Sequence, residues 1–277
     1  MASLDKLQKN WESYAQADPL WAICTDRAKR GGRWTKDEFF ATGDREIGKI
    51  MEYLRSQGLS PDRNTAALDF GCGVGRLTQA LSQYFDECSG VDISPTMIQL
   101  AKSFHSANPR CSFFLNPVDD LRQFPDGHFG FIYTSITLQH IPKHCIRGYL
   151  LELIRVLTPG GIFVFQVLDK SRILQKVKRN LRSLQCYANR LLGRNGVGSL
   201  KMEMNCISEN EIRQLFSGHG VSIVDVRFTN STDRSFNGDI QFVEQEPNRG
   251  HISKQYCVVK DEISCLPQPR LDSPRTG

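Results

Sequence analysis

Two different spacings of apolar residues follow one another along this chain of 277 residues. Over residues 1–60 the apolar positions recur at helical intervals, which predicts N-terminal helices. These positions are Leu4, Leu7, Trp11 and Tyr14, followed later by Ile47, Ile50, Met51 and Leu54. The stretch between them, 18–40, is rich in Trp, Arg and Gly and has no clean period, so we expect a loop with short helical pieces.

From residue 65 onward, short apolar runs alternate with segments of helical period. The runs predict strands at 65–70, 88–91, 111–115, 129–136, 161–168, 221–228 and 255–259. Helices are expected at 77–84, 95–101, 149–157 and 209–216, and a polar loop is expected at 230–249. Alternation of this kind is typical of an α/β protein with a doubly wound, mostly parallel sheet covered on both faces.

Two segments interrupt or end this alternation. Residues 170–194 form a basic amphipathic stretch that predicts a helical insert over 170–200, and residues 263–277 have too few apolar side chains to pack. We therefore divide the chain into an N-terminal helical segment (1–60), a main domain (61–262) that contains the insert, and a disordered tail (263–277).

The most informative chemistry lies in the sequence ALDFGCGVG, residues 67–75. Gly71, Gly73 and Gly75 follow a predicted strand and precede a predicted helix, so the backbone can touch a ligand and free N–H groups can hold it. A dinucleotide fingerprint would need glycine at Arg76. In addition, the carboxylate of Asp69 would repel phosphates but attract an ammonium group.

A second acid stands at the end of the next predicted strand. Asp92 follows Gly75 by 17 residues, in the sequence GVDIS. There it can accept hydrogen bonds from both hydroxyls of a ribose, or it can cap the following helix. The glycine loop upstream favours the ribose interpretation.

These residues resemble the motifs of the class I S-adenosylmethionine (SAM)-dependent methyltransferase family. The sequence DFGCGVG (69–75) matches the family's first motif, and Asp92 matches the acid that closes its second strand. The segment 129–142 is similar to the family's fourth strand and the following loop, and TPGG (158–161) is similar to the turn before its fifth strand. The resemblance covers residues 60–170 well and 205–260 loosely.

The resemblance implies a Rossmann-like sheet of seven strands, six parallel and the last antiparallel, with residues 1–60 as a lid and a helical insert after the fifth strand. It also implies SAM as the cofactor. Gly71, Gly73 and Gly75 would approach its methionine part, Asp69 its amino group, Asp92 its ribose and Ile93 its adenine. Pro117 replaces the acid that often contacts adenine, which leaves Asp119, Asp120 or Asn116 for that contact.

His140, in the loop behind the fourth predicted strand, is the candidate catalytic base for a hydroxyl acceptor. It can equally be a structural histidine that binds a backbone carbonyl. Thr134, Ser135 and Gln139 are expected to line the same crevice. In the N-terminal segment, Tyr14 is a candidate to face the sulfonium and Arg33 to bind the SAM carboxylate, although the aromatic residues can also serve only to dock a helix.

Charge and composition limit the kinds of partner that we expect for this protein. The basic insert has eight Lys or Arg and no acid over 170–194, which suits an anionic acceptor, an acyl carrier, a membrane surface, or simply a solvated helix. With only Tyr187 among these charges, nucleic acid is not an expected partner. Nine scattered cysteines without a CxxC pair predict reduced thiols, a cytoplasmic location and no metal.

We therefore predict a methyltransferase that transfers a methyl group from SAM to a small-molecule acceptor, with oxygen favoured because His140 is available. No apolar run is long enough for a membrane span. One alternative is a non-catalytic SAM-binding or scaffold protein. The other is an NAD-dependent oxidoreductase, against which both Arg76 and Asp69 argue.

Overall fold

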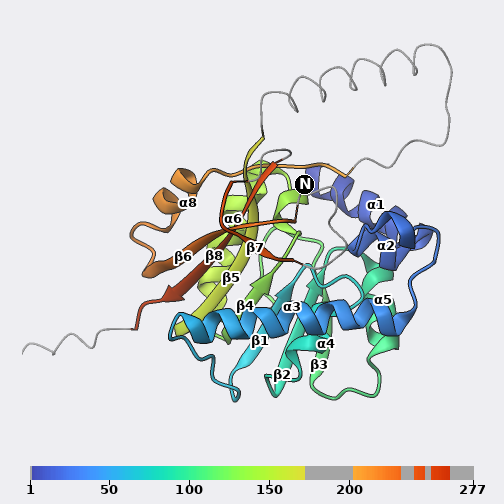
Figure 1. Cartoon of the computed structure of the whole chain (residues 1–277), viewed down its shortest axis with the longest axis horizontal. Coiled ribbons are helices and arrows are strands. Elements are labelled where there is room, and N and C mark those ends of the chain that lie inside the picture. Colours follow the sequence, from blue (N-terminus) through green and yellow to red (C-terminus); the bar gives the residue numbers. More distant parts are fainter. Residues whose placement is uncertain (1, 172–201, 232–239, 247–250, 263–277) are drawn as a thin grey trace, which may run out of the picture.

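The computed structural model describes residues 2–171, 202–231, 240–246 and 251–262 of the chain (Figure 1). The predictions of a helical insert beyond residue 171 and of a disordered tail at 263–277 lie outside these residues.

The described strands form one sheet of eight. They are β1 (Ala66–Phe70), β2 (Glu87–Asp92), β3 (Cys111–Leu115), β4 (Phe129–Thr134), β5 (Leu157–Ser171), β6 (Val221–Thr229), β7 (Phe242–Val243) and β8 (His251–Lys260). Their order in the sheet is β3-β2-β1-β4-β5-β8-β6-β7.

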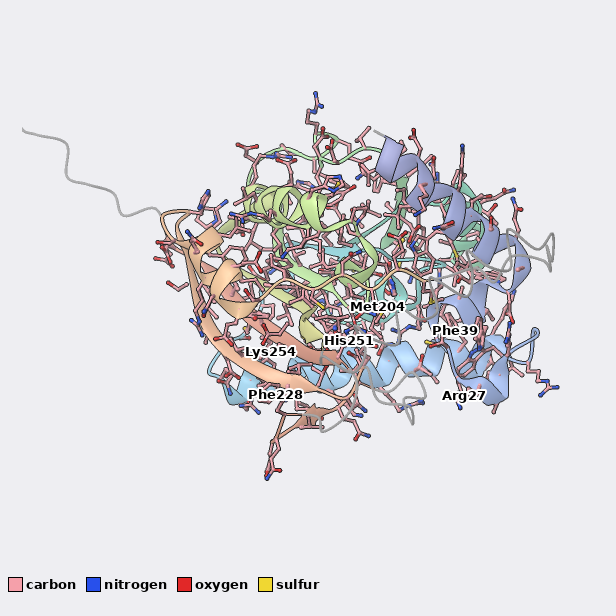
Figure 2. All side chains as sticks on the ribbon, turned by 90° about the horizontal axis from the view of Figure 1, so that it is seen from above. Arg27, Phe39, Met204, Phe228, His251 and Lys254 are labelled. Atoms are coloured by element: carbon pink, nitrogen blue, oxygen red, sulfur yellow. The ribbon has the colours of Figure 1, made fainter. Side chains whose placement is uncertain are left out.

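Strands β1 to β5 pair in parallel, and β8 is antiparallel to both of its neighbours, β5 and β6. For example, Phe228 of β6 lies opposite Lys254 of β8 (Figure 2). Strand β6 therefore runs in the same direction as β1 to β5, which confirms six parallel strands and one reversed strand. The two-residue β7 is an addition, because it pairs with β6 inside the segment 230–249 that was predicted to be a loop.

Nine helical segments accompany the sheet in the described part of the chain. They are α1 (Ala2–Ala17), α2 (Pro19–Ile23), η1 (Arg27–Lys29), α3 (Lys36–Ser56), α4 (Arg76–Leu81), α5 (Pro95–Phe104), η2 (Leu138–His140), α6 (Lys143–Val156) and α8 (Glu209–Phe216). Local sequence explains several of their starts. A capping box of Thr35 and Glu38 begins α3, and the Ser94 side chain accepts the Met97 N–H at the start of α5.

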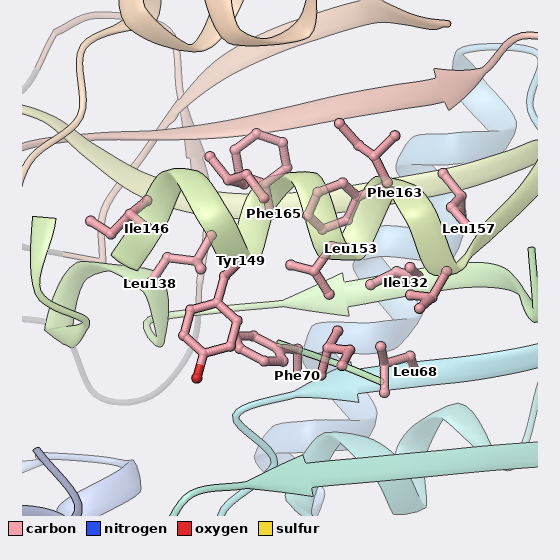
Figure 3. Close-up of a cluster of buried hydrophobic side chains, with 14 of the residues drawn as sticks. Leu68, Phe70, Ile132, Leu138, Ile146, Tyr149, Leu153, Leu157, Phe163 and Phe165 are labelled. Atoms are coloured by element: carbon pink, nitrogen blue, oxygen red, sulfur yellow. The ribbon is translucent and has the colours of Figure 1, made fainter. Parts of the chain in front are cut away.

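The helices cover the sheet on both faces. On one face, α3 and α4 enclose a core with alternate strand residues such as Ala67 and Phe131, and α3 lies across β1, β2 and β4 (Figure 1). On the other face, Tyr149 and Leu153 of α6 lie against Phe70, Phe163 and Phe165 of the sheet (Figure 3). Because side chains alternate along a strand, each buried strand supplies both cores.

Helix α3 shares its core with the sheet through Ile47, Ile50 and Leu54, so it forms part of the covering layer. Helices α1 and α2 lie elsewhere, at the end of the sheet where β5 finishes (Figure 1). Within residues 1–60, α1 and α2 are therefore the part that can cover a site at that end.

Candidate active site

A cavity of about 230 Å³ lies at the carboxyl ends of the central strands, where the strand order reverses between β1 and β4. In open α/β sheets, this reversal point is where ligands bind. Four strand ends contribute Phe70, Gly71, Cys72, Gly73, Val91, Asp92, Ile93, Asn116, Ser135, Ile136, Thr137, Gln139, His140 and Ile141 to its wall. Helices α1 and α2 add Leu7, Trp11, Ala22 and Ile23, and more distant segments add Met202, Met204 and Ser231.

The glycine bend forms one wall of the cavity. Gly71, Gly73 and Gly75 all have positive φ, at 84°, 54° and 84°, a conformation that other residues rarely adopt. A Cβ at Gly71 would collide with the side chain of Thr137, and one at Gly73 would collide with Ile23. Gly71 and Gly73 therefore let the backbone lie at the cavity surface. Gly75 is different: it is the N-cap residue of α4, its Cα faces Phe113, and it does not line the cavity.

Asp92 braces the bend from the end of β2. Its Oδ2 accepts the Gly73 N–H at 2.9 Å, and its Oδ1 accepts the Ser94 N–H at 2.8 Å. Burial raises the pKa of Asp92, while these backbone donors oppose that shift. The N-cap of α5 is Ser94 rather than Asp92, so the capping interpretation is wrong. Asp92 and its neighbour Ile93 both line the cavity.

Asp69, which was predicted to face the amino group of SAM, is not among the residues that line the cavity. Leu68 and Phe70 belong to the core under α6, so the alternation of β1 turns Asp69 to the opposite face. There its Oδ2 accepts the Thr78 hydroxyl of α4 at 2.7 Å, whereas its Oδ1 is buried without a partner. Burial raises the pKa of Asp69 to about 7.

The three residues considered for contact with adenine lie in different places. Neither Asp119 nor Asp120 lines the cavity: Asp119 is exposed, and Asp120 forms an ion pair with Arg122 at 2.6 Å. Asn116, the third residue considered, does line the cavity and is 5% exposed. Its Nδ2 donates to the Val118 carbonyl at 3.0 Å, which fixes the orientation of the amide.

His140 lies in the cavity wall at the end of η2, and both of its ring nitrogens have hydrogen-bond partners. Its Nδ1 is 2.7 Å from the Glu203 carbonyl, which can only accept, so Nδ1 carries the proton and Nε2 keeps its lone pair. The Gln139 amide lies 3.2 Å from Nε2, and the Trp11 ring meets the imidazole edge-on at 5.3 Å. Burial lowers the pKa of His140 to about 4, so the ring is neutral at pH 7.

The remaining predicted residues divide into those inside and outside the cavity wall. Ser135 and Gln139 line it, but Thr134 does not, because its hydroxyl donates to the Phe70 carbonyl at 2.8 Å within the sheet. Tyr14 lines a smaller adjoining cavity together with Trp11 and His140. Arg33, which was predicted to bind the SAM carboxylate, is exposed and lines neither cavity.

Arg76 is a cavity residue that the sequence reasoning missed, because it was considered only as a missing glycine. Its Nη2 forms an ion pair with Glu46 of α3 at 2.8 Å, and Tyr133 donates to the other Glu46 oxygen at 2.9 Å. Burial alone would lower the pKa of Arg76, but the Glu46 carboxylate outweighs it and raises that pKa. The Nε of Arg76 is buried without a hydrogen-bond partner.

Charge is scarce in this wall. Among the described lining residues, Arg76 carries the guanidinium group and Asp92 the carboxyl group, and each is already bound by protein groups. The described residues contain no cluster of three side chains able to hold a metal ion. Across the same ranges, no helix is both long and apolar enough to span a membrane.

Part of this chain is similar in sequence to known methyltransferases. Residues 68–165 match a family model described as a methyltransferase domain. Over 128 residues the chain is 31% identical to 2-heptyl-1-hydroxyquinolin-4(1H)-one methyltransferase of Mycobacteroides abscessus, covering 46% of this chain and 53% of that protein. Over 101 residues it is 35% identical to demethylmenaquinone methyltransferase of Tropheryma whipplei, covering 35% of this chain and 39% of that one. The chain thus spans about half the length of these relatives, or less.

The fold is similar to that of magnesium protoporphyrin IX methyltransferase from Synechocystis PCC 6803, solved with bound SAH. The TM-score is 0.59 at 16% identity, covering 93% of this chain and 99% of that one. Residues 68–165 are therefore similar to a methyltransferase domain, and the fold is similar to that of a methyltransferase.

Proposed function

We propose that this protein transfers the methyl group of SAM to a small-molecule acceptor held in the cavity described above. One observation carries the proposal: Gly71, Gly73 and Asp92 converge on a single cavity at the strand reversal, and the Asp92 carboxylate is bonded to the Gly73 N–H at 2.9 Å. Positive φ at Gly71 and Gly73 brings their backbone to the cavity surface, and a carboxylate is an acceptor suited to ribose hydroxyls.

The chain's own residues fit the parts of SAM. Asp92 would hold the ribose, and Ile93 with Asn116 would enclose the adenine. The backbone at Gly71 and Gly73 would follow the methionine part. Arg76, whose Nε has no partner, is a better candidate for the SAM carboxylate than Arg33.

The part of the cavity away from these SAM-facing residues suits a ring-bearing acceptor with a hydrogen-bonding group. Its walls combine the apolar Trp11, Ile141, Met202 and Met204 with polar groups such as Gln139. Since the guanidinium and carboxyl groups of the wall are already bound by protein groups, a neutral acceptor is favoured over an anionic one. The named substrates of two relatives, a hydroxyquinolone and demethylmenaquinone, are ring compounds of this kind.

Oxygen is the acceptor atom that we propose. Bound SAM supplies an electrophilic methyl group, and most of the acceleration then comes from holding the nucleophile in line with it. The Nε2 lone pair of His140 can take the proton of a hydroxyl once the Gln139 amide moves aside. With its pKa near 4, His140 is suited to acidic hydroxyls such as phenols and N-hydroxyl groups rather than to alcohols.

The domain division belongs to the same proposal. Helices α1 and α2 would act as the lid, because Trp11 and Ile23 already line the cavity and would keep water from the methyl group. The tail at 263–277, contact of the basic segment 170–194 with a membrane surface, and a cytoplasmic location remain predictions from the sequence.

Methyl transfer is tested with isotope-labelled SAM and an acceptor panel analysed by mass spectrometry. The panel contains hydroxyquinolones, hydroquinones, simple phenols and aliphatic alcohols. We expect a labelled methyl group on a ring hydroxyl and none on the alcohols. A label found only on nitrogen or carbon would refute oxygen as the acceptor atom. SAM binding without any turnover would instead favour the non-catalytic alternative.

A further inference from the structure

One residue in the cavity wall has a backbone conformation that its side chain disfavours. Ile136 has φ of 57°, and it is the single non-glycine residue at positive φ among the residues that the structure describes. A β-branched side chain in this region is a true outlier. Such strain persists only where the surroundings enforce it, and it gathers at functional sites.

Gln166 of β5 supplies the contact that holds Ile136. Its Oε1 accepts the Ile136 N–H at 2.9 Å, and the Gln166 side chain is 1% exposed. Its Nε2 lies 2.7 Å from the Ser253 hydroxyl, 3.3 Å from that of Ser231, and 3.3 Å from the Gln139 Oε1. One buried amide therefore connects the loop after β4 to β8, to Ser231 two residues after β6, and to Gln139 beside His140.

The loop 135–140, which Gln166 holds, connects the cavity wall at the glycine bend with the wall formed by Gln139 and His140. Thr137 packs over the Cα of Gly71, so the loop touches the glycine bend on one side. On the other side it leads into Gln139 and His140, the polar groups on the acceptor side. A change of φ at Ile136 would move these residues relative to the bend.

We propose that Gln166 is a positioning residue, which holds the loop 135–140 in the strained conformation that aligns the acceptor with the methyl donor. The proposal rests on the proposed function, because the alignment matters only if methyl transfer occurs here. The cofactor is held from β1 and β2, so Gln166 acts on the acceptor and not on SAM.

The test is a set of paired substitutions. Gln166→Met removes the hydrogen bonds, and it is made in the wild type, in Ile136→Ala and in Ile136→Gly. Both changes at Ile136 remove the side chain beyond Cβ, and glycine also lacks the Cβ, so only glycine adopts positive φ freely. Gln166→Glu keeps an acceptor for the Ile136 N–H, and it serves as the conservative variant if the methionine variant does not fold.

We expect Gln166→Met to lower kcat/KM for the acceptor at least tenfold while the Kd for S-adenosylhomocysteine stays within about twofold. The loss of kcat/KM caused by Gln166→Met should be as large in the Ile136→Ala background as in the wild type, but at least threefold smaller in the Ile136→Gly background. Gln166→Glu should retain more activity than Gln166→Met. An equal loss in all three backgrounds would overturn the proposal, as would an S-adenosylhomocysteine affinity that falls in parallel with turnover.

A second readout separates this proposal from the proposed function. Thermal unfolding of the same variants measures whether Gln166 and Ile136 are coupled without any acceptor or cofactor. If the wild type neither binds S-adenosylhomocysteine nor methylates the panel, the proposed function fails and positioning for transfer fails with it. If the wild type is active but Gln166→Met lowers the melting temperature equally in all backgrounds, the hold on Ile136 is refuted while the function stands.

Discussion

The buried ion pair between Glu46 and Arg76 links α3 to the helix that follows the glycine bend. The two side chains are 1% and 5% exposed, and their charged atoms are 2.8 Å apart. Thr42 accepts a further hydrogen bond from Arg76 at 3.3 Å, and Tyr133 donates one to Glu46. Glu46→Gln preserves the shape of the side chain but leaves the guanidinium of Arg76 buried without a counter-charge.

Removing one partner of a buried pair costs about 3–5 kcal/mol, because the remaining charge has lost its compensation. For a chain of this size, about 1 kcal/mol corresponds to roughly 2–4 °C in melting temperature, so Glu46→Gln should lower it by about 6–20 °C. Replacing both residues, as Glu46→Leu with Arg76→Met, should cost clearly less than the sum of the two single changes, since no lone charge stays buried.

The assay is thermal unfolding at pH 7 followed by circular dichroism. The control is Arg63→Gln, which breaks an ion pair with Asp86 in which both side chains are about half exposed, at 51% and 49%. Such a surface pair contributes about 0–1 kcal/mol. If Glu46→Gln is no more destabilising than Arg63→Gln, or if the double variant equals the sum of the single variants, the reasoning about this buried pair is wrong.

Three further predictions follow. Since burial raises the pKa of Asp69 to about 7, the folded protein binds more protons than the unfolded chain between about pH 4 and 7. Ionised Asp69 thus opposes folding at higher pH. The melting temperature of Asp69→Asn minus that of the wild type should therefore be more positive at pH 8 than at pH 5, and an equal difference at the two pH values would contradict this. For His140, with its pKa lowered to about 4, the unfolded chain binds more protons from about pH 6.5 down to 4, so His140→Asn should lose less stability on acidification than wild type does. Gly71→Ala should destabilise by at least about 1–2 kcal/mol in urea unfolding, because φ is positive and Thr137 blocks the Cβ; a smaller cost would show that the bend can adapt.

Most of the fold could be predicted because apolar periodicity reports burial directly. Strands β1 to β5 and the reversed β8 were located this way, and the fold class was confirmed. The exceptions depend on pairing between distant segments. Strand β5 extends to Ser171 because β8 pairs along it, and β7 exists only through its contact with the edge strand β6. Helix α6 begins earlier than predicted, at Lys143, directly after Pro142.

Some features of the site also have a local signal in the sequence, and others do not. Gly71, Gly73 and Asp92 belong to local motifs that the sequence shows, and all three line the same cavity. Asp69 was expected near the cofactor, but the apolar Leu68 and Phe70 on either side place its side chain on the opposite face of the sheet.

Other site features had no local signal. Arg76 and Glu46 are 30 residues apart, and Gln166 meets Ile136 across 30 residues, so only the folded chain brings them together. Met202 and Met204 reach the cavity from beyond the basic insert, and no spacing in the sequence predicts that contact.

Calorimetric titration with S-adenosylhomocysteine measures whether the cavity beside Gly71, Gly73 and Asp92 binds the cofactor product. We expect saturable one-to-one binding by the wild type. Asp92→Ala should weaken this binding by about 10-fold or more, as expected from the loss of charge-assisted hydrogen bonds. Asp120→Asn, which alters a carboxylate outside the cavity, should leave the binding unchanged. Absence of binding by the wild type, or equal affinity of the wild type and Asp92→Ala, would contradict the claim that this cavity is the cofactor site.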